Sequence, residues 1–115
     1  MSLLAKIAVA TSVSIALSIS LQASDLVKKG EKIFNTKKIG NCLACHAVNG
    51  KDIDNPGDLG PKLSGLKNYP DKYLYDKVYN PYTTNPTSAM PPFGLNGILM
   101  PDEIKAVVAY LKTIQ

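Results

Sequence analysis

The chain has 115 residues and a formal net charge of +4, and all of its positive side chains are lysines. This length allows one ordinary domain, which excludes dinucleotide-binding dehydrogenases, (β/α) barrels and multi-domain enzymes. One His and no Arg leave few groups for an acid–base triad or a bidentate phosphate clamp. The lysines form no stripe interleaved with aromatic residues, so we expect no nucleic-acid partner.

Residues 1–23 have the composition of a secretory signal peptide. Lys6 supplies a short positive region, and the apolar stretch 7–21 that follows is too short to span a membrane as a helix. A more polar segment from Gln22 fits a cleavage region, although Leu21 is larger than the small residue preferred before a cut. We expect residues 24–115 to be a periplasmic domain without stable membrane insertion, and an uncleaved anchor is the alternative.

Apolar residues recur at helical spacing directly after this segment and predict a helix over about 25–37: Leu26, Val27, Gly30, Ile33 and Phe34. Ser24 or Asp25 can cap its start, and Asp25 also favours the positive end of the helix dipole.

The segment Cys42-Leu43-Ala44-Cys45-His46 is a C-x-x-C-H motif. Two thiols about one helical turn apart can each form a thioether with a vinyl group on one porphyrin edge, and the next residue offers an imidazole nitrogen to the iron. We therefore expect one covalently attached haem c, held by Cys42 and Cys45, with His46 as the proximal ligand.

Three other uses of these residues fit less well. A zinc site needs about four ligands, and the chain has only three Cys and His residues in total. A thioredoxin-like pair needs a βαβ pattern around it, which the sequence lacks. A disulfide across two intervening residues would close a very small loop and stabilise little.

The rest of the chain alternates loops and helices. Residues 49–62 are rich in Asn, Gly, Asp and Pro and predict a loop. Pro70 lies at or near the start of a helix that ends before Pro81. Prolines and glycines then predict an extended loop over 80–101.

The last helix has the clearest periodicity: Ile104, Val107, Val108 and Leu111 share one face, and Pro101 suits the first helical position. Phe34 and Tyr110 are expected to pack where the first and last helices cross, with Gly30 allowing a close approach. No alternating strand pattern follows the leader, so the expected fold class is all-α, with short helices around one haem.

The sixth coordination position of the haem needs a ligand other than His. Met90 lies in a loop that Pro91 and Pro92 restrict, and this can present its thioether rigidly. Met100 is the alternative ligand or a core residue, and Lys, water or an open position are the remaining options. We expect Met90, because His/Met ligation is a common pairing that raises the reduction potential and favours electron transfer over oxygen chemistry.

These features together resemble a class I cytochrome c: the segment from Gly30 to Phe34, the C-x-x-C-H motif, Gly60-Pro61-Lys62-Leu63, a Met on a proline loop and a C-terminal helix. Narrower segments resemble the SoxX-type monohaem cytochromes, the small haem subunits of the periplasmic thiosulfate-oxidising complex: 40–46, 56–61, 85–86, 90–94 and 97–99.

The resemblance implies that His46 and Met90 are the axial ligands and that the Pro61 carbonyl accepts a hydrogen bond from the other His46 ring nitrogen. One departure is visible. Where the family usually has a hydroxyl residue that caps the last helix, this chain has Met100-Pro101, which predicts a weaker cap.

The resemblance also implies a larger cytochrome subunit as partner, which contains the catalytic haem, and a downstream electron acceptor. The chain is then a non-catalytic, electron-accepting subunit of an enzyme of the L-cysteine S-thiosulfotransferase type. The alternatives are a free soluble monohaem cytochrome c that serves a terminal oxidase, a sensor haem with an open sixth position, and a haem-free thiol-redox protein.

Overall fold

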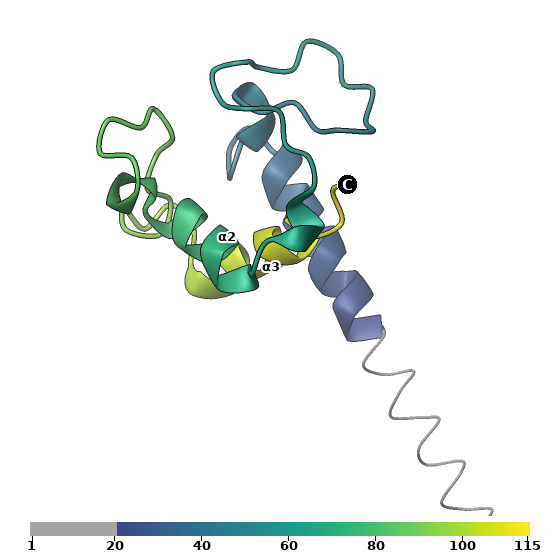
Figure 1. Ribbon diagram of the computed structural model, residues 1–115. Coiled ribbons are helices and arrows are strands. Elements are labelled where there is room, and N and C mark those ends of the chain that lie inside the picture. The colour runs from purple at the N-terminus through teal and green to yellow at the C-terminus, as the bar shows by residue number, and fades with distance from the viewer. Residues whose placement is uncertain (1–20) are drawn as a thin grey trace, which may run out of the picture.

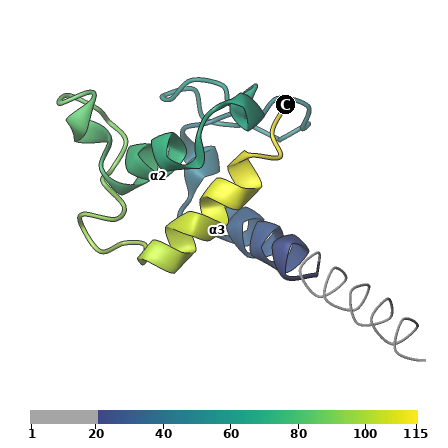
Figure 2. The same ribbon diagram turned by 60° about the horizontal axis from the view of Figure 1, so that its bottom comes forward.

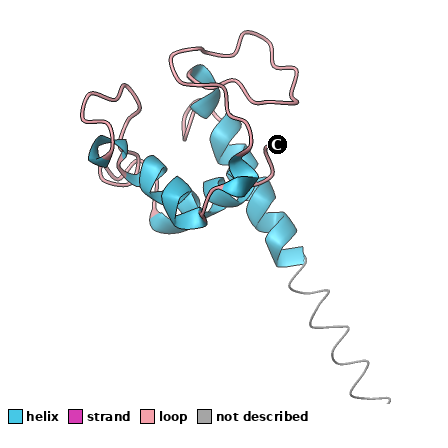
Figure 3. Ribbon diagram, viewed as in Figure 1, coloured by secondary structure: helices cyan, strands magenta, loops and turns pink. Residues whose placement is uncertain are grey.

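A computed structural model describes residues 21–115, in which short helices are joined by long loops (Figure 1 and Figure 3). The first described helix covers 21–35, α2 is Asp71–Tyr79 and α3 is Pro101–Leu111. Three single turns of 3₁₀ helix lie between them: η1 Cys42–Ala44, η2 Leu66–Asn68 and η3 Pro81–Thr83. Within residues 21–115 the only strand-like pairing is a bridge between Val48 and Leu63, so the all-α prediction is confirmed.

The first described helix differs from its prediction at both ends. Ser24 and Asp25 lie inside the helix and do not cap it, because Leu21, Gln22 and Ala23 before them already have helical conformation. The helix ends two residues earlier than expected, and Thr36 bonds to the Lys32 carbonyl through both its N–H (3.0 Å) and its hydroxyl (2.5 Å). Most of the predicted signal peptide, residues 1–20, lies outside the described residues.

The first described helix crosses α3, and both views show the contact (Figure 1 and Figure 2). At the crossing, a Cβ placed on Gly30 would lie 2.5 Å from the Ala106 carbonyl carbon and 3.0 Å from Tyr110 Cβ. Phe34 meets Tyr110 edge to face, with ring centroids 5.2 Å apart, and both side chains are buried. The predicted crossing and the role of Gly30 are confirmed.

The helix α2 packs against α3 and buries Leu74 and Val78. Pro70 has extended backbone and immediately precedes the helix, so the helix begins one residue after it. The Lys112 ammonium at the end of α3 forms an ion pair with Asp71 at 3.2 Å. The C-terminal tail then returns to η2, where the Leu66 N–H donates to the Ile114 carbonyl at 3.1 Å.

The start of α3 compensates for the missing hydroxyl cap. Pro101 is the first helical residue, as predicted, and the Glu103 carboxylate accepts a hydrogen bond from the Met100 N–H at 2.9 Å. The Met100 side chain is 52% exposed, so it does not fill the core. No helix within the described range 21–115 is long and apolar enough to cross a membrane.

Candidate haem site

The C-x-x-C-H motif folds into one tight turn. Asn41 has left-handed backbone (φ 52°), a conformation that Asn tolerates better than most residues, and η1 starts after it. The Cys42 carbonyl then accepts hydrogen bonds from the N–H groups of Cys45 (3.2 Å) and His46 (2.9 Å). The structure therefore brings the two predicted thioether positions and the predicted proximal ligand together on one turn.

The two thiols are free and partly buried. Burial raises the pKa of the Cys42 thiol to about 11, so the thiol is protonated at neutral pH. A neutral sulfur thus suits this position better than a thiolate. A thioether has no proton to lose, and the same surroundings can hold it without the cost of burying a charge.

The His46 ring is fixed from two sides. Its Nδ1 atom lies 2.7 Å from the Pro61 carbonyl oxygen, and in the tautomer in which Nδ1–H donates, Nε2 is left free to bind a metal. A Cβ placed on Gly60 would lie 2.8 Å from both ring nitrogens, so only Gly allows the imidazole to rest against the chain here. The contact between His46 and Pro61 is the one that the resemblance implied.

The loop 49–62 is attached to the motif by backbone bonds that the sequence patterns did not predict. The Gly57 N–H donates to the Leu43 carbonyl at 3.0 Å, and the Gly60 N–H donates to the Cys45 carbonyl at 2.8 Å. A Cβ on Gly57 would lie 2.7 Å from the Cys45 nitrogen, which explains why this loop needs glycine there. The glycines were the available signal, but their spacing alone does not reveal what they touch.

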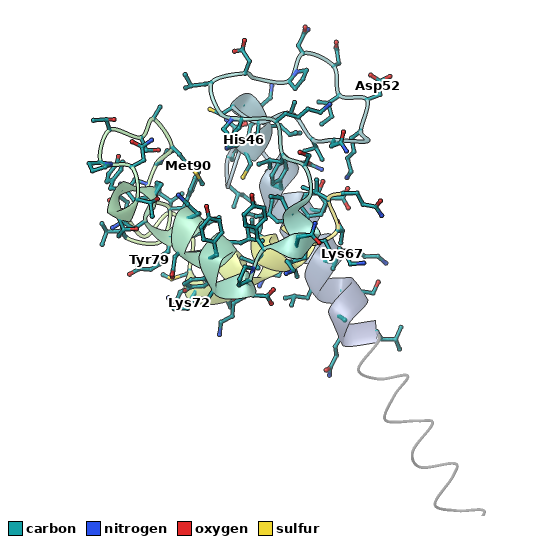
Figure 4. All side chains as sticks on the ribbon, in the orientation of Figure 1. His46, Asp52, Lys67, Lys72, Tyr79 and Met90 are labelled. Carbon is teal, nitrogen blue, oxygen red and sulfur yellow. The ribbon has the colours of Figure 1, made fainter. Side chains whose placement is uncertain are left out.

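Met90 lies in the other loop region, beyond α2. Its side chain is partly buried against the hydrophobic core, and its N–H donates to the Ser88 hydroxyl at 3.1 Å. Figure 4 shows Met90 and His46 on separate loops whose inner sides face one another. Met100, the alternative ligand, is more than half exposed at the start of α3.

Residues 27–115 match the Cytochrome c family. The chain belongs to the cytochrome c family. Among solved structures, this cytochrome is similar to a chain of SoxXA from P. pantotrophus, with 30% identity and a TM-score of 0.66. The match covers 75% of this cytochrome and 79% of that chain. The resemblance to SoxX-type monohaem cytochromes c is therefore confirmed.

A second relative is a protein of Aquifex aeolicus (strain VF5) that is described as an uncharacterized lipoprotein. It is 41% identical over 92 residues, which cover 75% of this cytochrome. The match spans only 44% of the relative's own length.

The cofactor of this cytochrome is covalently bound haem c. The residues present fit that group, because two thiols and an imidazole share one turn. Gly60 leaves the space in which the His46 ring lies, and the Pro61 carbonyl holds Nδ1 so that Nε2 is available for iron.

Proposed function

We propose that this cytochrome is the electron-transfer haem subunit of a periplasmic thiosulfate-oxidising complex, in which it pairs with a larger cytochrome subunit. The observation that carries the proposal is the similarity to a chain of SoxXA over 79% of that chain. In this assignment the larger subunit holds the catalytic haem, and this chain accepts electrons and passes them to a downstream acceptor.

In the same proposal Cys42 and Cys45 are the thioether positions, and His46 and Met90 are the axial ligands. The bound haem supplies a one-electron iron couple. The hydrogen bond from His46 to Pro61 orients the imidazole and increases its basicity. The neutral Met90 sulfur would favour the reduced state of the bound haem, and with His46 and Met90 both holding the iron no place would remain there for a substrate.

The proposal includes export, with removal of residues 1–23 to leave the domain 24–115. The mass of the exported protein under denaturing conditions measures leader cleavage and covalent haem attachment together. We expect the mass of residues 24–115 plus one haem, and the haem should resist extraction into acidified organic solvent because thioethers survive it. Release of all haem would contradict covalent attachment, and an intact leader would contradict cleavage.

The Met90 assignment predicts a sulfur–iron charge-transfer band in the far-red spectrum of the oxidised protein. The substitution Met90→Ala should abolish the band and lower the reduction potential, because a soft neutral ligand is lost. Met100→Ala is the matched control and should retain the band, since Met100 is exposed at the start of α3. The opposite result would assign the ligand to Met100.

The subunit assignment predicts that the isolated chain exchanges electrons with small mediators but does not oxidise thiosulfate. After haem attachment the chain has no free Cys, and it has no second His and no Arg to orient a sulfur oxyanion. Thiosulfate-dependent electron transfer should appear only when the larger cytochrome subunit is added, and the two should co-elute in gel filtration. Equal rates with and without that subunit would contradict the assignment, and failure to co-elute would favour a free carrier.

A further inference from the structure

The loop that contains Met90 starts directly after Tyr79 and returns to form hydrogen bonds with the same residue. Tyr79 is the last residue of α2, and the chain leaves the helix at Asn80. After Met90 and two prolines the chain returns, and the N–H groups of Gly94 and Leu95 both donate to the Tyr79 carbonyl at 3.1 Å. Residues 80–95 thus form a closed loop of the Ω type, and Tyr79 is its closing point.

The Tyr79 ring adds a second contact at this point. A Cβ placed on Gly94 would lie 2.6 Å from Tyr79 Cε2 and 2.7 Å from Cγ, so this edge of the ring lies directly against the Gly94 α-carbon. The Tyr79 ring also stacks on Tyr75, with centroids 6.0 Å apart and planes 12° from parallel. Tyr75 itself packs against the hydrophobic core, which fixes the position of the pair.

The returning segment is tied down by hydrogen bonds and by a buried side chain, so its attachment at Tyr79 constrains where Met90 lies. The Phe93 carbonyl accepts from the N–H groups of Ile98 (2.9 Å) and Leu99 (3.0 Å), and the Phe93 side chain is buried. Pro91 and Pro92 restrict the backbone between this buried residue and Met90. Movement of Gly94 away from Tyr79 would therefore move the Met90 sulfur as well.

We propose that Tyr79 is a positioning residue for the distal ligand: its carbonyl and its ring close the Met90 loop on Gly94 and Leu95 and hold the Met90 thioether toward the haem. This inference rests on the proposed role of Met90. The hydroxyl of Tyr79 has no part in it, because the contacts are made by the carbonyl and by ring carbons.

The test measures how often the loop opens in the oxidised holoprotein, with imidazole as the probe. Imidazole can bind the iron only when Met90 has left, so its apparent Kd equals the intrinsic Kd divided by the open fraction. We expect Tyr79→Ala to tighten the apparent imidazole Kd by about tenfold, because the ring contact with Gly94 is lost. Tyr79→Phe keeps that contact and should stay within about twofold of the unaltered protein.

Tyr73→Ala is the matched control. Tyr73 lies on the same helix and stacks on Tyr69 at 5.2 Å, whereas the atoms nearest to a Cβ on Gly94 all belong to Tyr79. The loss of the Tyr73 ring should therefore change imidazole affinity by less than about twofold. Gly94→Ala disturbs the same closing point from the other side and should also tighten the apparent Kd. This variant keeps the test valid if Tyr79→Ala does not yield holoprotein.

The outcomes separate this inference from the ligand assignment. If the charge-transfer band is present and needs Met90, but Tyr79→Ala and Gly94→Ala bind imidazole as Tyr73→Ala does, the positioning role alone is overturned. If Met90→Ala leaves both the band and the imidazole affinity unchanged, the ligand assignment fails and this inference fails with it.

Discussion

Gly60 shows how one missing side chain determines the position of the His46 ring. The Gly60 N–H is bonded to the Cys45 carbonyl, and its α-carbon faces the His46 ring. The next residue, Pro61, accepts the hydrogen bond from Nδ1. The two consecutive residues therefore set both the distance and the rotation of the imidazole.

Gly60→Ala should lower the free energy of unfolding by about 1–3 kcal/mol, the usual cost of an added methyl in a filled space. The displaced ring should also perturb the low-spin haem spectrum. Denaturant titration and visible absorption measure the two effects. Gly50→Ala is the control: it also strains the chain (φ 79°), but nothing lies within 4 Å of the new methyl, so the haem spectrum should not change. An unaltered spectrum in Gly60→Ala would contradict the steric role.

At the scale of elements, the crossing of the first helix with α3 holds the helix that leads into the C-x-x-C-H motif. The crossing is close because Gly30 presents no side chain to the Ala106 backbone, and the aromatic pair Phe34–Tyr110 fills the space beside it. The C-x-x-C-H motif begins only a few residues after Phe34, so the orientation of the first helix affects where the turn of this motif begins.

Gly30→Ala tests this close contact, because the contact determines whether the substitution raises or lowers the free energy of unfolding. In an exposed helix this change stabilises by roughly 0.5–1 kcal/mol, because Ala is the better helix former. Here the new methyl would overlap the Ala106 backbone, so we expect a loss of about 1–3 kcal/mol in urea denaturation. Lys28→Ala, at an exposed position of the same helix, should stay within about 0.5 kcal/mol of the unaltered protein. A stabilised Gly30→Ala variant would contradict the crossing geometry.

At the scale of the whole molecule, Lys51 connects the loop 49–62 to the place where the first helix crosses α3. Its ammonium group donates to the Tyr110 hydroxyl at 2.8 Å and to the Glu31 carboxylate at 2.9 Å. The bond to Tyr110 and then the bond to Glu31 hold the pKa of Lys51 above its ordinary value of 10.5. Three segments that are distant along the chain meet at this one side chain.

The substitution Lys51→Met should therefore lower the free energy of unfolding at neutral pH, and this difference from the unaltered protein should disappear at alkaline pH. A raised folded-state pKa means that the stabilisation is complete below the unfolded value of 10.5 and disappears as pH rises through the folded value. The Lys51 and Glu31 side chains are each 42% exposed, so solvent screening limits the effect to roughly 0.5–1 kcal/mol.

Urea denaturation of the unaltered protein and the Lys51→Met variant, at pH 7 and at rising alkaline pH, measures this difference. Lys72→Met removes an i,i+4 pair in which Lys72 is 84% exposed, and it should have little effect at any pH. A Lys51→Met difference that increases above pH 10.5 would contradict the linkage.

Local sequence was sufficient to predict the haem c cofactor, the all-α class and the last helix. The C-x-x-C-H motif lies within five residues, and the periodicity of α3 lies within one helix, so both depend on neighbours along the chain. The chosen distal residue, Met90, came from proline content in one loop and stays a prediction.

The contacts that orient these groups depend on the three-dimensional fold. Pro61 meets His46 across 15 positions, and Lys51 meets Tyr110 across 59. At Gly60 and Gly94 a side chain would overlap an aromatic ring from another segment, so these positions require glycine. The sequence alone does not distinguish such a loop glycine from one that faces solvent. Contacts between distant segments leave no periodic pattern, since they depend on how the helices pack and where each loop returns.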